Sequence, residues 1–348
     1  MARFVMRVAG ETVFFDTHEG PHLDEIATKW LIEKFGDKEF LDKYVSNRIL
    51  EVGIGGGLFD EHPVNSERKE GECAATLVAK ALGVDDNPAL EKILKFVVTH
   101  DLKGGAQPFD LASLVKLLHQ QFPNDPERVI EWAMVGLEAK YREQLQFFTA
   151  TKQEFERAAE IEEIQGPGRQ TLKMVTVVSD DEQMSKFARS SFGGGAAIII
   201  QRRSSGNVQI YTNKRYGLTL YDVAQMIRLA EQRAKGQVVM TDWETLSSEG
   251  KVEGTEEWFF HHAGQMLLNG SLTAPDVPPT KLSLEQIKEM VRIGINPQAF
   301  EQSRAQLCRS GNCTSTRNDQ CPWYPWGLHR CRAIRYKMRN PNHFLNSR

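Results

Sequence analysis

Two histidines and an aspartate lie within seven residues near the N-terminus, at His18, His22 and Asp24. Further carboxylates and imidazoles follow other apolar segments of the N-terminal third. These are Glu51, Asp60, Glu61, His62, His100 and Asp101. Mixed sets of imidazole and carboxylate ligands suit divalent transition metals such as manganese, zinc or iron. The sequence therefore predicts a metal site assembled from several separate segments.

This set is larger than the four ligands of a tetrahedral zinc ion. Two ions about 3.5–4 Å apart that share a bridging carboxylate would use all of it. Such a pair acidifies a bridging water and stabilises a phosphoryl centre, so hydrolysis of a phosphate ester is the predicted chemistry. Each residue alone has a plainer interpretation: His18 as a hydrogen-bonded loop residue, and Asp24 as an acid that stabilises a helix N-terminus.

Alternating strands and helices must position these groups. Apolar runs predict strands at 11–17 and 49–52, and helical periodicity predicts helices over 23–35, 73–82 and 88–99. Such alternation indicates an α/β fold with a mostly parallel sheet and helices on both faces. In sheets of this kind, ligands bind beyond the carboxyl ends of the strands.

A second α/β segment follows a glycine-containing stretch, residues 164–170, that is typical of a linker. Its predicted strands span 172–179, 196–201, 208–211 and 258–262, and its predicted helices span 218–235 and 282–293. We therefore expect three parts, namely a metal-binding catalytic domain over 1–163, a smaller substrate-binding α/β domain over 171–295, and a tail over 303–348.

The stretch "THEGPHLDEIA", beginning at Thr17, resembles the H-x-x-P-D-x-D opening motif of the DHH phosphoesterase superfamily. "RILEVGIGGGLFDEHP", beginning at Arg48, resembles the V-D-V-G-G…Y-D-H-H stretch of its melanocyte-proliferating-gene exonuclease branch. "KEGECAATLVAKALG" and "FVVTHDLKGG" are similar to later segments of that family, so the resemblance covers about residues 10–105. Glu61 stands where the family has the middle histidine of its namesake motif.

The resemblance implies a DHH-like two-domain fold and a site with two metal ions, for which we expect Mn²⁺. The metal ligands that it implies are His18, His22, Asp24, Glu51, Asp60 and Asp101. Glu61 and His62 would act as catalytic residues that position metal, water or phosphate. The family's second domain closes over the metals, and by that similarity Arg215, His261 and His262 would bind substrate phosphate. The plainer interpretation makes Arg215 a surface residue in a turn and places His261 behind Trp258.

Four of the five cysteines lie in the tail, at Cys308, Cys313, Cys321 and Cys331. A segment too short for its own core needs a cross-link, and in a reducing compartment metal serves better than disulfides. Zinc is the first choice, an iron–sulfur cluster uses the same number of thiolates, and unligated thiols are the third interpretation. Cys73 lies on the apolar face of a predicted helix and is expected to be an ordinary core residue.

The tail is also strongly basic. Residues 303–348 hold nine Lys/Arg and one acid, so their net charge is +8. The remaining chain has a net charge of −11, which gives the total of −3. Aromatic residues lie between the cations, a combination typical of surfaces that bind single-stranded nucleic acid. The alternative is a structural tail whose tryptophans pack on the body and whose arginines are solvated.

These features together predict a metal-dependent phosphodiesterase or exonuclease that acts on single-stranded RNA or DNA, or on short oligonucleotides. Two alternatives are an enzyme for a small nucleotide or cyclic dinucleotide, and a catalytically impaired nucleic-acid-binding module.

No apolar run approaches the length of about 20 residues that spans a bilayer. Arg7 and Glu11 interrupt any signal-peptide core, so we expect a cytoplasmic protein that does not act at a membrane. The sequence leaves open whether the chain forms a homo-oligomer.

Overall fold

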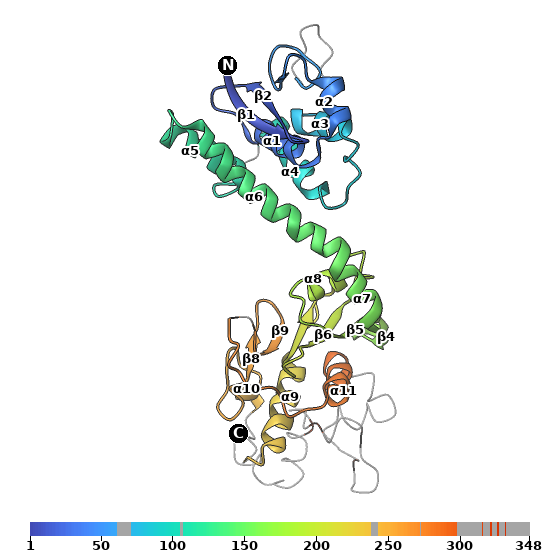
Figure 1. The fold of residues 1–348 in the computed structure, drawn as a ribbon. Helices are drawn as coiled ribbons and strands as arrows, with labels where there is room; N and C mark the ends of the chain where they lie inside the picture. Colours follow the sequence, from blue (N-terminus) through green and yellow to red (C-terminus); the bar gives the residue numbers. More distant parts are fainter. Residues whose placement is uncertain are drawn as a thin grey trace. The chain divides into compact units, whose positions relative to one another are not determined.

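The computed structural model of this chain describes residues 1–60, 71–104, 107–237, 243–271 and 273–297, together with Ser315, Cys321, Trp326 and Cys331 (Figure 1). The chain divides into two compact units, which we call unit 1 (Met1–Thr149) and unit 2 (Ala150–Arg348). None of the helices in the described ranges is long and apolar enough to cross a membrane.

Unit 1 contains a three-stranded sheet of β1 (Ala2–Val8), β2 (Glu11–Thr17) and β3 (Ile49–Glu51), in that order. β1 and β2 form an antiparallel hairpin, and β2 pairs with β3 in parallel. Side chains of β1 are alternately buried and exposed, as expected for a sheet with one covered face.

Six helices complete unit 1. They are α1 (Leu23–Phe35), α2 (Lys38–Tyr44), α3 (Ala74–Ala81), α4 (Glu91–Lys103), α5 (Leu111–Gln121) and α6 (Pro126–Gln146). α1 is central, because it contacts β1, α3, α4, α5 and α6. Ile26, Trp30 and Leu31 of α1 recur at helical spacing and are buried in the core with Phe4 and Phe15 of the sheet. Each such side chain contributes about 1.5–3 kcal/mol by burial.

The chain passes into unit 2 through a π-helical segment, η1 (Phe147–Thr151), and α7 (Lys152–Ala158). Six strands form one sheet in the order β4-β5-β6-β7-β9-β8. Their bounds are β4 (Glu160–Gln165), β5 (Thr171–Val178), β6 (Ile198–Arg202), β7 (Val208–Thr212), β8 (Trp258–His261) and β9 (Met266–Asn269). The remaining elements are η2 (Pro167–Arg169), α8 (Met184–Arg189), η3 (Lys214–Tyr216), α9 (Tyr221–Ala234), α10 (Trp243–Leu246) and α11 (Leu284–Ile295).

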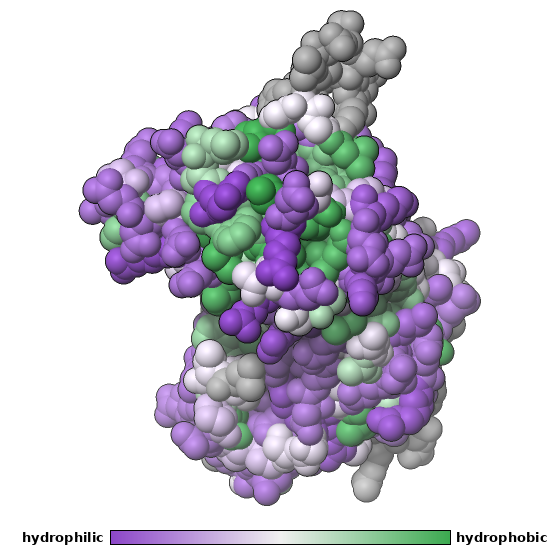
Figure 2. All heavy atoms as spheres, turned by 45° about the horizontal axis from the view of Figure 1, so that its top comes forward, coloured by the Kyte–Doolittle hydropathy of each residue, from purple (hydrophilic) through white to green (hydrophobic). Residues whose placement is uncertain are grey.

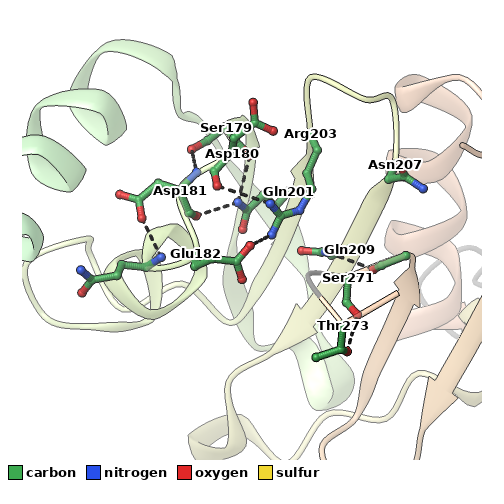
Figure 3. A network of polar contacts seen from close by, with 12 residues as sticks. Ser179, Asp180, Asp181, Glu182, Gln201, Arg203, Asn207, Gln209, Ser271 and Thr273 are labelled. Carbon is green, nitrogen blue, oxygen red and sulfur yellow. Dashed lines mark hydrogen bonds and ion pairs between the residues drawn. The ribbon is translucent and has the colours of Figure 1, made fainter. Parts of the chain in front are cut away.

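A polar network holds the loop after β5 against the end of β6 (Figure 3). Gln201 is buried, and its Nε2 donates to the carbonyl oxygens of Ser179 (3.0 Å) and Asp181 (2.9 Å). Arg203 pairs with Glu182 and also donates to the carbonyl of Asp180. These partners are all protein groups, so the network stabilises the fold of unit 2.

The α/β class is confirmed, but the prediction of a mostly parallel sheet is wrong. Both sheets are mixed, and among the named strand pairs the parallel ones are β2–β3 and β5–β6. Short connections cause this, because strands joined by a few residues pair antiparallel. The β1–β2, β6–β7 and β8–β9 connections are all of this kind. Residues 164–170, interpreted as a linker, join β4 to β5 within unit 2.

Candidate metal centre

The N-terminus of α1 gathers three groups that are able to hold a metal ion. A ligand atom from each of His22, Asp24 and Glu25 lies within 4.8 Å of the other two. β2 ends at Thr17, a short turn follows, and α1 begins at Leu23 with His22 in the N-cap position. Strand and helix therefore fix both ends of the segment that carries these side chains.

Glu25 is the buried centre of this cluster, and the sequence analysis missed it. Its Oε1 accepts a hydrogen bond from Thr17 Oγ1 (2.7 Å) and contacts His18 Nδ1, while Oε2 accepts from the backbone N–H of His22 (2.7 Å). A Cβ atom at Gly53, whose φ is +67°, would lie 2.6 Å from Glu25 Oε1. Glycine is therefore required at residue 53 for the loop after β3 to approach this carboxylate.

A pocket of about 210 Å³ adjoins the cluster and is walled by α1, α4 and α5. We call it the histidine–carboxylate pocket. It is lined by His22, Leu23, Asp24, Val97, His100, Asp101, Ala112, Val115, Lys116 and His119. Three imidazoles and two carboxylates thus meet in one hollow of unit 1.

Two histidines of the pocket present ring nitrogens suited to metal binding. His100 Nε2 is buried without a hydrogen-bond partner among the described residues, and Asp110 Oδ1 lies 3.8 Å from it. His119 Nε2 lies 2.9 Å from the carbonyl oxygen of Pro21. A carbonyl only accepts, so Nε2 carries the proton and Nδ1 has the lone pair. Burial lowers the pKa of His119, which favours the neutral ring that metals require.

Cys73 lies behind the pocket and is not a candidate ligand. It is fully buried, and burial together with the charges of Asp24 and Asp101 raises the pKa of its thiol to about 12. Cys73 is not among the residues that line the pocket, so it is not placed to ligate an ion there. Cys73 is the core residue that the apolar helix face indicated.

The structure brings some of the sequence-predicted ligands together and not others. His22, Asp24 and Asp101 line the pocket, and Asp101 lies in the last turn of α4 rather than after it. His18 is adjacent, with its ring stacked on that of His22 at 6.2 Å between centroids.

Glu51 and Asp60 are not among the pocket-lining residues. Glu51 is exposed beside Gly55, and Asp60 is buried with its Oδ2 accepting from the backbone N–H of Gly56 (2.8 Å). Glu61 and His62, the predicted catalytic residues, lie outside the described residues. His100 was in the set of candidate ligands but not among the ligands that the resemblance implied, and it lies on α4. Lys116 and His119 had no assigned role, because α5 joins the site from far along the chain.

The predicted substrate-binding residues of unit 2 lie at one edge of its sheet. β7 and β8 both run antiparallel to β9, so Arg215, just after β7, and His261, at the end of β8, share that edge. The contacts of His262 are with the surrounding fold. Its ring packs against Tyr221 and Phe260, and its Nε2 donates to the carbonyl of Ser247 (3.0 Å).

Of the tail cysteines, Cys321 and Cys331 are buried in the core of unit 2, with Trp326 packed against it. Cys308 and Cys313 lie outside the described residues, as do the tail arginines that the sequence analysis counted.

Residues 15–143 match the family model described as the C-terminal domain of ChrB, a chromate resistance regulator. The matched segment lies within unit 1 and contains every residue that lines the histidine–carboxylate pocket. No curated protein and no solved structure matches the chain.

This match overturns the resemblance to the DHH phosphoesterases, which is wrong. The motifs that suggested it describe a strand, a turn and a helix N-terminus with a nearby aspartate. That arrangement presents similar residues in unrelated folds, because helix N-termini favour acidic side chains. The three-stranded mixed sheet beneath it is also not the mostly parallel sheet that the resemblance implied.

Proposed function

We propose that unit 1 binds one divalent transition-metal ion in the histidine–carboxylate pocket. The observation that carries the proposal is that His22, Asp24, His100, Asp101 and His119 line one hollow, next to the place where ligand atoms of His22, Asp24 and Glu25 lie within 4.8 Å of one another. His100 Nε2 is buried without a hydrogen-bond partner among the described residues. A buried nitrogen without a hydrogen bond is costly, and a metal ion would satisfy it. Nitrogen and carboxylate ligands together favour manganese, iron or zinc over magnesium or calcium.

The residues around the pocket would have two roles, some as metal ligands and others as groups that hold those ligands in place. His22 and Asp24 would ligate from α1, and His100 and Asp101 from α4. Glu25 would hold His18 and the His22 backbone, and thereby fix the direction of the His22 ring. Such supporting groups raise metal affinity without being ligands themselves.

Elemental analysis of the purified chain and calorimetric titration with Mn²⁺, Zn²⁺ and Fe²⁺ test this proposal. We expect one ion per chain, and a loss of affinity of about a hundredfold or more in Asp24→Asn and His100→Ala. His261→Ala in unit 2 is a matched control that should leave binding unchanged. A chain that binds no ion, or variants that bind as tightly as the parent, would refute the site.

The name of the matched family favours a metal-linked regulatory role. A second candidate is hydrolysis of phosphodiesters in nucleic acid or of a small nucleotide, with metal-activated water as the nucleophile. Lys116 at the pocket supports this candidate, since its cation would attract a substrate phosphate to the ion. The two-ion arrangement has weaker support, because Glu51 and Asp60 do not line the pocket.

Incubation with labelled RNA, DNA and dinucleotides in the presence of Mn²⁺ separates the two candidates. Product that disappears in Asp24→Asn supports the enzyme, whereas metal binding without product supports regulation.

A nucleic-acid partner and a metal in the tail are further proposals from the sequence of residues 303–348 alone. Replacement of Arg332 and Arg335 by glutamine should weaken strand binding and flatten its dependence on salt, and it keeps Cys321 and Cys331 in the core of unit 2. The cytoplasm remains the proposed compartment.

A further inference from the structure

Helix α6 exposes an apolar stripe to solvent. Trp132 is 44% exposed, Val135 is 70% exposed, and Ala139 is also exposed. Their spacing of three and four residues places them on one side of the helix. Figure 2 shows apolar residues that reach the surface of unit 1 among polar ones. Exposed apolar groups gathered on one face indicate an interaction surface.

The neighbouring helix α5 and the residues before it also expose apolar side chains. α5 packs on α6 where Leu111 meets Gly136, since a Cβ built at Gly136 lies 3.4 Å from the Leu111 side chain. Leu117 on α5 is 54% exposed, and Phe109, just before it, is 87% exposed. The described residues of unit 1 leave the stripe uncovered, although the rest of α6 packs against α1 and the core.

Charges beside the stripe allow the face to complement itself, and two of them, Arg142 and Glu143, also pair with Glu138 and Lys140 within α6. Arg128 and Glu131 lie toward the N-terminus of α6, and Arg142 and Glu143 lie toward its C-terminus. An antiparallel crossing of two α6 helices near Gly136 places Glu131 of each copy across from Arg142 of the other. The same crossing places Arg128 across from Glu143. A parallel pairing would instead bring like charges together, which is unfavourable.

The sizes of the apolar residues agree with the same crossing. In an antiparallel crossing, residues at similar distances before and after the crossing point face each other, so Trp132, four residues before Gly136, lies near Ala139 of the other copy, three residues after it. Leu111 of α5 fills the space beside Gly136, so two α6 helices would meet through Trp132, Val135 and Ala139, with their axes about 8–10 Å apart. We propose that the chain forms a two-fold homodimer in which the two α6 helices cross antiparallel near Gly136.

Sedimentation equilibrium of the full chain, from below one micromolar to about a hundred micromolar, tests the proposal. The parent chain is expected to reach the dimer mass within this range, where modest specific interfaces associate. Val135→Glu places one buried carboxylate on each side of the interface and should raise the dissociation constant at least about a hundredfold. Val178→Glu, at a valine that is 55% exposed in unit 2, is the matched control and should have no effect. A monomeric parent chain, or equal effects of both variants, overturns the proposal.

A charge exchange identifies the occupant of the face as a second copy. Glu131→Arg and Arg142→Glu should each weaken the dimer about tenfold, because each creates two like-charge pairs. The double variant should return to within about threefold of the parent, since the exchanged charges match again. Denaturation of each variant controls for folding, because Arg142 also donates to Glu138 (2.7 Å). If the double variant is as weak as the single ones, a different surface covers α6 and the proposal fails.

Discussion

Each unit holds a buried nitrogen-bearing side chain, Arg228 in unit 2 and His100 in unit 1, and the two differ in how much of their hydrogen-bonding capacity is used. In unit 2, Arg228 is fully buried, and its Nη atoms donate to the carbonyls of Leu246 (2.9 Å), Ser248 (2.9 Å), Gly250 (2.5 Å) and Trp258 (3.1 Å). In the pocket of unit 1, by contrast, the buried His100 Nε2 has no such partner among the described residues. Arg228 Nε also lacks a hydrogen-bond partner among the described residues, so an unused buried nitrogen indicates a ligand site only where other ligand groups gather near it, as they do near His100.

The largest effect on stability is expected at Arg228. Burial lowers the pKa of Arg228 to about 10, so it remains charged at neutral pH. Arg228→Met should lower the free energy of unfolding of unit 2 by about 3–5 kcal/mol, because four carbonyls lose their partner. Urea denaturation measures this, with Arg157→Met as the exposed control. A loss below about 1 kcal/mol would show that Arg228 is not structural.

Glu25 should have the next largest effect, and on metal binding. Glu25→Gln keeps the shape of the side chain but weakens its contact with His18. We expect the metal affinity to fall about 10–100-fold, which corresponds to about 1.4–2.8 kcal/mol. Calorimetric titration measures the affinity, and Glu33→Gln on the same helix is the control. Unchanged affinity would separate Glu25 from the site.

Glu138 extends the comparison to a bonded acid within unit 1. Burial raises its pKa, but hydrogen bonds from Lys34, Arg142 and Trp30 outweigh this and lower it to about 2, from an ordinary value of 4.5. A lowered folded-state pKa stabilises above the unfolded value, and this stability disappears as the pH falls from 4.5 toward 2.

Glu138→Gln should therefore destabilise the chain by about 1 kcal/mol at pH 7, after allowance for solvent screening. The difference from the parent should shrink steadily below pH 4.5. Thermal denaturation at pH 7, 4 and 3 measures it, and a difference that is constant with pH would contradict the lowered pKa.

The smallest effect on the stability of the metal-free chain is expected at His100, in contrast to the large effect at Arg228. His100→Leu removes an unsatisfied buried nitrogen, so the metal-free chain should be unchanged or up to about 1 kcal/mol more stable. The same variant should lose metal affinity. Denaturation with and without Mn²⁺ measures both, and marked destabilisation of the metal-free chain would assign His100 a structural role.

Local patterns in the sequence predicted several elements accurately. β2 and α1 have the predicted bounds, because alternation, a turn and helical spacing are local signals. Strand direction was predicted wrongly, because the pairing of β4 with β5 depends on a turn that resembles a linker.

The site was predictable only where its residues are close in the chain. His22 and Asp24 share one turn of helix and were found together. His119 reaches the pocket through packing of α5, about a hundred residues away, for which a single sequence gives no signal. Glu25 was missed because an acid in the first turn of a helix has an ordinary capping role.

The protonated, enclosed sulfur of Cys73 has a consequence for selectivity among metals. Thiophilic ions such as Cu⁺ depend on thiolate or thioether donors for their advantage over harder ions. The Cys73 sulfur is buried near Asp24 and Asp101 and does not line the pocket. The side-chain ligands that the pocket offers to these ions are therefore imidazole nitrogen and carboxylate oxygen. The pocket therefore gives Cu⁺ no soft donor, whereas its nitrogen and oxygen donors suit divalent first-row ions, Cu²⁺ included.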